Sequence, residues 1–554
     1  MPGRYRMKVL MALGVAGSLM ATACDDGLDI TNLNNPDVDR AFSTPVGVET
    51  IVSKLFQQMH QGQYLPTPAG GGDHLWTQTQ TMSFESSSQL GNFGMGTRGA
   101  IPRGLIDNSI GNREEVGNFR DFDHLSRNSR MAANAIDALN VFETEGRTLG
   151  HRRDLRAKSF AYFTLGYAHG FLALFYDSLG IVRPGELEGT EVPEFSGPTE
   201  GMAAALEMLD SALAVLARDT ATAAFIPAAW MAQAADITKD QYRRIIRSYK
   251  ARFRAGVGRT PADRALADWD AILADATNGI TSDLNVVLSV SGGWTNGWIA
   301  QAAVSSGWHQ ITPFIFGMAD TSRAYDTWLA TPLMQRAPFL IKTPDLRFPA
   351  GETRAEQQAK VPTASPVIAP DTVLYIRNRP AGQDTPAEPW GTSYYDFVRF
   401  WRIRNRDGGS GPFPIMTVAE IDMLAAEAHL RDGSFAAAAA LIDKYRLQNN
   451  LPSVAGVTNG VDPVPGGNRC VPRVPVGPNF TSTTCGNLWE AMKWEKRMET
   501  AFTGYGQWYL DSRGWGDLVI GTPLEWPVPY QELFARGRPS YRNERVAARS
   551  NYGW

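Results

Sequence analysis

Residues 488–515 constrain the fold more than any other segment, because one helical stripe here combines apolar residues with two carboxylates. Its members recur at steps of three and four and so share one helix face: Leu488, Ala491, Met492, Glu495, Met498, Glu499 and Phe502. An inward carboxylate is costly unless a cation or hydrogen-bond donor meets it. The nearest candidate cations in sequence are Lys496, Arg497 and Arg513. The segment therefore predicts a packed interior helix.

The N-terminal segment has the layout of a secretory signal. Three basic residues within the first eight positions precede an apolar run over 9–23 that ends at Cys24. This run is shorter than the roughly 20 residues that a membrane helix needs. Ala21, Thr22 and Ala23 before Cys24 resemble a lipobox, so we expect a signal peptide over 1–23 and a lipid on Cys24. The alternative is an ordinary signal that happens to precede a cysteine.

The other two cysteines, Cys470 and Cys485, lie fifteen residues apart in a Pro-rich and Gly-rich segment. An even pair in an oxidising compartment indicates a disulfide. A metal site is the competing interpretation, but the sequence has neither a C-x-x-C motif nor a histidine nearby.

Composition excludes one class of partner. The chain has 53 Lys and Arg against 57 Asp and Glu, and its charges are interspersed. Because a nucleic-acid binder carries a basic excess or basic clusters, we expect no nucleic acid. The 554 residues exceed one simple core, which favours several domains or a helical scaffold with long insertions.

Apolar periodicity favours the scaffold. It predicts helices over 45–61, 124–142, 155–176, 202–217, 242–255, 265–277, 418–431 and 435–447. The last two enclose Asp432 and Gly433, and Gly433, Phe435 and Ala438 match the turn of a tetratricopeptide hairpin. A regular solenoid would repeat about every 34 residues, whereas 281–411 interrupts this one.

Three motifs together resemble the SusD/RagB family of surface lipoproteins. They are E-x-R-x-E followed by F-x-G and W-x-x-D-x-R-x-W within 495–515, the Pro-rich approach to A-E-A at 412–428, and W-P-V-P at 526–529. Gln507 departs from the arginine usual in that family. The resemblance implies a mainly α fold of interrupted tetratricopeptide hairpins with few short strands. It makes Glu495, Arg497, Glu499 and Arg513 a structural clasp.

The domain expectation follows from the same resemblance. We expect one SusD-like domain over 24–554, with the helical scaffold at about 45–280 and 412–515. The insertions at about 62–120 and 281–411 would face the ligand or the partner.

Catalytic motifs are missing from the sequence. There is no H-E-x-x-H, nucleophile elbow or phosphate loop. Glu495 and Glu499 on one helix face are badly placed for glycoside hydrolysis, which needs acids across a sugar bond. We expect no enzyme activity, no cofactor and no metal.

Ligand-binding candidates lie in two segments predicted to be irregular, 70–98 and 289–308, where aromatic residues alternate with Gly, Asn and Gln. They are Asp73, Trp76, Phe84, Trp294, Asn296, Trp298 and Trp308. A ring on a turn can stack on a sugar or an apolar side chain. The alternative is that each tryptophan only pins its loop to the scaffold. By contrast, the aromatic and basic alternation at 394–404 predicts a buried or edge strand.

The resemblance implies a two-part nutrient-uptake device. Such lipoproteins sit on the outer face of the outer membrane and close as hinged lids over a SusC-like TonB-dependent barrel, which carries an oligosaccharide or peptide inward. Two alternatives remain: a periplasmic tetratricopeptide adaptor that binds a protein partner, and a secreted glycoside hydrolase.

Overall fold

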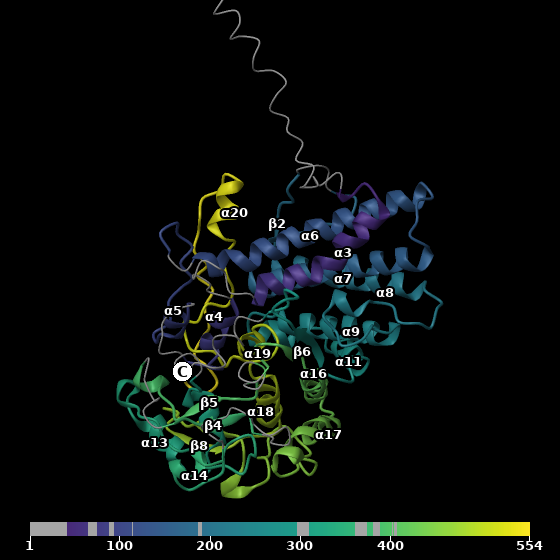
Figure 1. Ribbon diagram of the computed structural model, residues 1–554. Coiled ribbons are helices and arrows are strands. Elements are labelled where there is room, and N and C mark those ends of the chain that lie inside the picture. The colour runs from purple at the N-terminus through teal and green to yellow at the C-terminus, as the bar shows by residue number, and fades with distance from the viewer. Residues whose placement is uncertain are drawn as a thin grey trace, which may run out of the picture.

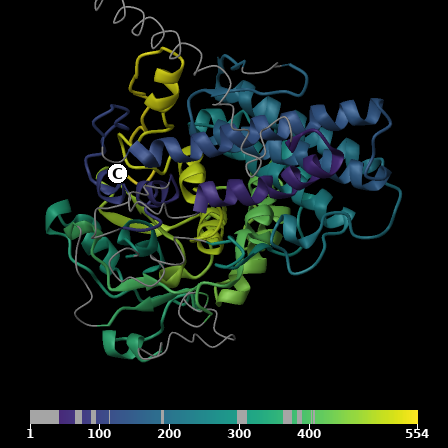
Figure 2. The ribbon, with the colours of Figure 1, turned by 45° about the horizontal axis from the view of Figure 1, so that its top comes forward.

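The computed structural model describes residues 41–64, 75–87, 94–112, 115–186, 191–295, 310–360, 374–380, 388–400, 403 and 407–554. Figure 1 shows a helical half and a second half of short helices and strands, and Figure 2 gives the same division from another direction. Helix α18 lies where the helical half meets the second half. Nearly all of the core belongs to one cluster that includes residues from Val48 to Tyr552.

The helical half is a layered array in which each helix packs on the next. Its members are α3 (Pro45–Tyr64), α6 (Glu115–Thr144), α7 (His151–Phe175), α8 (Pro198–Ala217), α9 (Lys239–Gly256), α11 (Trp269–Thr277), α16 (Val418–Arg431), α17 (Phe435–Arg446) and α18 (Leu488–Thr500). Contacts run from α3 to α6, through α7, α8, α9 and α11, and on to α16, which touches both α17 and α18. The mainly α fold with interrupted hairpins is thus confirmed.

The predicted helix 418–431 has the observed bounds of α16, and α17 ends one residue before the prediction. The predicted helix 265–277 begins four residues too early. The observed α11 starts at Trp269, because the side chain of Asp268 accepts the N–H of Ala271 and caps a new helix, while Ala265 ends the preceding α10 (Pro261–Ala265). Leu266, between the two, is 86% exposed.

The chain leaves the helical array at the start of the insertion 281–411 and returns to it at the end through two antiparallel strands that pair with each other. Strand β3 (Leu284–Leu288) pairs with β6 (Gly411–Met416), with Val286 opposite Phe413. Within the insertion, β4 (Ile376–Asn378) pairs with β5 (Tyr395–Phe397), as the alternation at 394–404 predicts. The insertion therefore begins and ends at one place on the helical half.

The remaining elements are short. They are α4 (Leu75–Met82), α5 (Met95–Gly99), α12 (Pro313–Phe316), α13 (Ala324–Ala330), α14 (Arg354–Gln358), α19 (Gln507–Trp515), α20 (Tyr530–Ala535), β1 (Leu179–Gly180), β2 (Phe195–Ser196), β7 (Arg473–Val476) and β8 (Ser482–Cys485). Over the described ranges, no helix is both long enough and apolar enough to cross a membrane.

Helix α4 corrects the expectation that 70–98 is irregular. All eight of its residues are buried, although five of them are Thr or Gln and the helix has no continuous apolar stripe. Hydroxyl groups make the polar composition compatible with a helix, because those of Thr79 and Thr81 donate to carbonyls three residues earlier. Trp76 therefore stands on a buried helix instead of a loop.

Candidate functional site

A path of contacting aromatic rings, which we call the path of rings, joins two of the predicted ligand-binding tryptophans. The ring of Trp76 lies 5.1 Å from that of Tyr64, Tyr64 lies 4.7 Å from His60, and His60 lies 5.4 Å from Trp294. Trp76 is only 2% exposed and Trp294 only 7%. The structure therefore places the two tryptophans at the ends of one buried path of rings.

The turn that holds Trp294 is fixed to α3 by three polar side chains. Gln57 Nε2 donates to the carbonyl of Gly292, and Gln61 Nε2 donates to the carbonyl of Gly293, each over 2.8 Å. Nε2 of His60 lies 3.0 Å from the carbonyl oxygen of Thr295. Burial lowers the pKa of His60 to about 4, so its ring is neutral near pH 7.

Sequence reasoning missed these three anchors. Gln57, His60 and Gln61 stand three and four positions apart on α3, so they share one helix face. That spacing was readable within 45–61. Their partners are main-chain carbonyls more than 230 positions away, which no local pattern identifies.

Phe84 belongs to a different aromatic cluster. Its ring stacks on Phe314 at 4.0 Å and lies 6.5 Å from Trp390 and 6.0 Å from Trp554. The structure thus separates Phe84 from the path between Trp76 and Trp294. Phe84 is 2% exposed.

Segments from both insertions meet at one place, which we call the loop junction: Ser87, Gln310, Gly391 and Asp396. Ser87 and Gln310 exchange main-chain hydrogen bonds of 2.7 and 3.1 Å, and Ser87 Oγ donates to the carbonyl of Gly391. Gln310 also bridges to Asp396 at the edge of β5. The first insertion is therefore joined to two separate parts of the second.

Glu85 connects the loop junction to the end of α18. The N–H of Phe502 donates to its Oε1 over 2.6 Å. Burial raises the pKa of Glu85 to about 8, so the carboxyl is mostly protonated near pH 7. Phe84 and Phe502 both have left-handed backbones, with φ of 61° and 57°, a conformation unusual for residues other than glycine.

The polar interior around α4 is incompletely hydrogen-bonded. Among the residues that the structure describes, the buried atoms Gln78 Nε2, Ser86 Oγ and Thr312 Oγ1 have no hydrogen-bond partner. Such groups are rare in folded proteins and often mark a functional place or an ordered water. These atoms flank the path of rings and the loop junction.

Four of the predicted ligand-binding residues, Asp73, Asn296, Trp298 and Trp308, lie outside the described residues, as does Cys24.

The clasp carboxylates are buried, but their partners differ from the nearest cations in sequence. Arg347 Nη1 donates to Glu495 over 2.9 Å and to Glu499 over 3.1 Å, and Arg446 also approaches Glu495. Lys496 instead pairs with Asp511, and Arg497 with Asp517. Because neighbouring helix positions point in different directions, the stripe of α18 faces the second insertion. Burial raises the pKa of Glu495 to about 7 despite both arginines.

Arg513 holds main-chain groups. Its guanidinium donates to the carbonyls of Leu524, Leu174 and Gly256. It therefore links α19 to the ends of α7 and α9 and to the segment that follows α19. Arg513 has a structural role, but it does not pair with Glu495 or Glu499.

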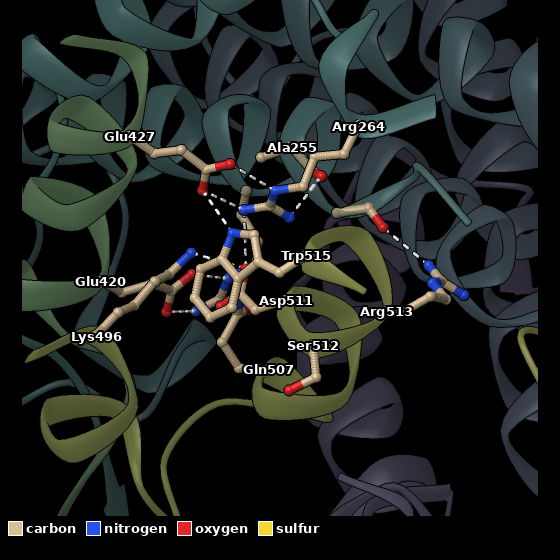
Figure 3. A network of polar contacts seen from close by, with 12 residues as sticks. Ala255, Arg264, Glu420, Glu427, Lys496, Gln507, Asp511, Ser512, Arg513 and Trp515 are labelled. Carbon is tan, nitrogen blue, oxygen red and sulfur yellow. Dashed lines mark hydrogen bonds and ion pairs between the residues drawn. The ribbon is translucent and has the colours of Figure 1, made fainter. Parts of the chain in front are cut away.

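A second ion network joins α10, α16, α18 and α19 (Figure 3). Arg264 donates to both oxygens of Glu427 over 2.8 and 2.6 Å and to Asp511 over 3.0 Å. Lys496 pairs with Asp511, and Trp515 Nε1 donates to Glu427. Burial alone would raise the pKa of Glu427, but Arg264 lowers it to about 2, so the carboxylate is ionised.

Cys470 and Cys485 are joined by a disulfide that ties the start of β7 to the end of β8. Among the described residues no cluster of three His, Cys, Asp or Glu side chains could hold a metal ion. The described geometry thus offers rings, amides and buried carboxyls for binding.

No protein-family model and no curated protein sequence matches the chain. Solved structures do. A SusD superfamily protein from Parabacteroides distasonis aligns over 90% of this chain and 99% of its own, with a TM-score of 0.54 at 10% identity. Another, from Bacteroides thetaiotaomicron, aligns over 91% of this chain and 100% of its own, with a TM-score of 0.52 at 11% identity. With its helical array and long insertions, the chain has the SusD-like fold.

Proposed function

We propose that the protein captures a nutrient, an oligosaccharide or a peptide, at the loop junction and the path of rings. The observation that carries this proposal is the convergence of both insertions at Ser87, Gln310, Gly391 and Asp396 on a SusD-like fold. Binding sites are commonly formed by loops on a rigid scaffold. The function is capture, without a chemical step.

The proposed contacts follow from where the rings lie. Trp76, Phe84 and Trp294 would form the apolar backing of the site, while Asp73, Asn296, Trp298 and Trp308 stay proposed as ligand contacts from the sequence. Nε2 of Gln78, which has no hydrogen-bond partner among the described residues, supports a polar ligand, because a sugar hydroxyl or peptide group could reach it through an ordered water.

Calorimetry of the mature protein against glycan and peptide pools tests capture and identifies the ligand class. Trp294→Ala should weaken binding about tenfold or more, since it removes one end of the path of rings. Phe534→Ala, which removes an exposed ring on α20, is the control and should leave this binding unchanged. Equal affinity of both variants and the wild type would contradict the proposed place.

We further propose that a lipid on Cys24 anchors the protein to the outer face of the outer membrane, where it acts as a hinged lid over a SusC-like TonB-dependent barrel. Palmitate labelling should disappear in Cys24→Ala. Purification in mild detergent should recover a large β-barrel with the wild type. Recovery of a different partner without a barrel would favour a periplasmic adaptor, and turnover of a glycan would favour a hydrolase.

A further inference from the structure

A pocket of about 440 Å³ lies between α11 and α16, and its lining includes none of the loop-junction residues. Its lining is Ala265, Trp269, Asp270, Leu273, Ala428, Arg431 and Asp432. The volume falls within the range of about 300 to 1,000 Å³ that is usual for small-molecule sites. The pocket therefore has room for a small ligand.

Arg431 is held in one orientation at this pocket. Its guanidinium stacks over the rings of Trp269 and Trp489, at 4.4 and 5.0 Å from their centroids. Its Nε and Nη2 both donate to Glu427 Oε1, over 3.2 and 2.8 Å. Among the described residues, no hydrogen bond uses Nη1. One edge of a fixed guanidinium is thus available for a ligand.

The ion network that includes Arg431 has one more cation than it has anions. Glu427 and Asp511 are the two anions of this network, and both are already paired with Arg264. Lys496 provides a second cation at Asp511, so Arg264, Lys496 and Arg431 make three cations against two anions. Arg431 is the member nearest to solvent, with 21% of its side chain exposed, while Arg264 and Lys496 are fully buried.

The rim of the pocket has the opposite charge. Asp270 is exposed in the first turn of α11, and no hydrogen bond or ion pair to it occurs among the described residues. Asp432 is 48% exposed and lies 3.8 Å from His429. A simple anion would be attracted by Arg431 but repelled by Asp270 and Asp432. A simple cation would be attracted by the two carboxylates but repelled by Arg431.

The apolar part of the lining completes the chemistry. Leu273, Ala265 and Ala428 join the ring of Trp269, whose Nε1 already donates to the carbonyl of Arg264 over 2.9 Å. The indole is therefore fixed and presents carbon atoms. An aliphatic side chain could remove this surface from water.

We propose that this pocket is a second binding site, which takes a zwitterion with an apolar side chain, namely an amino acid or short peptide. Its carboxylate would meet Nη1 of Arg431, its ammonium group would meet Asp270 and Asp432, and its aliphatic side chain would cover Trp269 and Leu273. The site is independent of nutrient capture at the loop junction.

The probes are L-leucine, leucyl-leucine and the uncharged N-acetyl-L-leucinamide, titrated into the mature protein by calorimetry. Leucine or its dipeptide should bind, and the uncharged analogue should bind about tenfold more weakly because both charged contacts are lost. No binding of either zwitterion at about 10 mM, or equal binding of the uncharged analogue, would overturn the proposal.

Two variants locate the site. Asp270→Asn should weaken leucine binding about fivefold with an unchanged melting temperature, because Asp270 makes no described contact that stabilises the fold. Glu544→Gln, another exposed carboxylate, is the matched control and should bind as the wild type does. Trp294→Ala should also leave leucine binding intact, which separates this site from the loop junction. Loss of leucine binding in Trp294→Ala, or its retention in Asp270→Asn, would refute the assignment.

Discussion

The ion network around Arg264 and the polar interior around α4 are both buried, but only the first is fully paired. Arg264, Glu427, Asp511 and Lys496 each meet an opposite charge. Around α4, Nε2 of Gln78 has no hydrogen-bond partner among the described residues, and the buried carboxyl of Glu85 is met by hydrogen bonds without a paired cation there. The difference indicates that the network around Arg264 stabilises the fold. We propose that the polar interior around α4 serves ligand capture instead.

The strongest way to break this comparison is to remove a charge from the paired network. Arg264→Gln leaves Glu427 and Asp511 buried with fewer cations, so the free energy of unfolding should fall by about 3 to 5 kcal/mol. Urea denaturation measures this change. Arg243→Gln is the matched control, because Arg243 and Asp240 form an exposed pair, and it should cost at most about 1 kcal/mol. Similar losses in both variants would refute a structural role for the buried network.

A pH series distinguishes the two regions through Glu85. Burial raises the pKa of Glu85 to about 8 in the folded protein from its ordinary value of 4.5, so the folded state holds the proton to a higher pH than the unfolded state does. The resulting stabilisation is fully present below pH 4.5 and is lost as pH rises towards 8. Glu85→Gln cannot titrate, so its stability relative to the wild type should increase between pH 5 and pH 8, by about 3 kcal/mol.

The measurement is the melting temperature of both proteins across that range. His60 changes stability in the opposite direction, because its pKa of about 4 lies below 6.5, and its contribution is lost as pH falls from 6.5 to 4. That contribution is common to both proteins and cancels in the difference. A constant difference between Glu85→Gln and the wild type would show that Glu85 has an ordinary pKa.

The sequence was sufficient to predict helices with a continuous apolar stripe, and this is why α16 and α17 were placed almost to the residue. Helix α4 has no such stripe, so its Thr and Gln residues resembled a loop. The inward position of Glu495 and Glu499 was predictable from the helix period. Their partners Arg347 and Arg446 were not, because a local pattern contains no information on which distant segment packs against α18.

The candidate site also has features that the sequence predicted and features that depend on tertiary packing. The aromatic composition identified Trp76 and Trp294, but the stacking of Tyr64 and His60 between them depends on tertiary packing. The loop junction depends on the pairing of Ser87 with Gln310, more than 220 positions away. Chain topology alone brings such residues together.

A smaller effect is expected where α3 holds the turn at 289–295. Gln61→Ala removes the hydrogen bond to Gly293 and should lower the free energy of unfolding by about 1 kcal/mol. Because the same turn carries Trp294, nutrient affinity should fall further than stability does. Gln335→Ala is the control, since Gln335 is exposed in the second insertion. If affinity and stability both stay at wild-type values, the turn needs no anchor on α3.

The smallest effect sharpens the comparison most, because its sign should be opposite to that of Arg264→Gln. Gln78→Met replaces an amide whose Nε2 is buried without a partner by an apolar side chain of similar length. Removing an unpartnered polar group relieves its desolvation cost, so the free energy of unfolding should stay unchanged or rise by up to about 1 kcal/mol. Urea denaturation measures the stability and calorimetry the nutrient affinity, which should fall if the amide serves the ligand. Destabilisation by about 2 kcal/mol or more would show instead that Gln78 is hydrogen-bonded in the folded protein, and the two buried regions would then be alike.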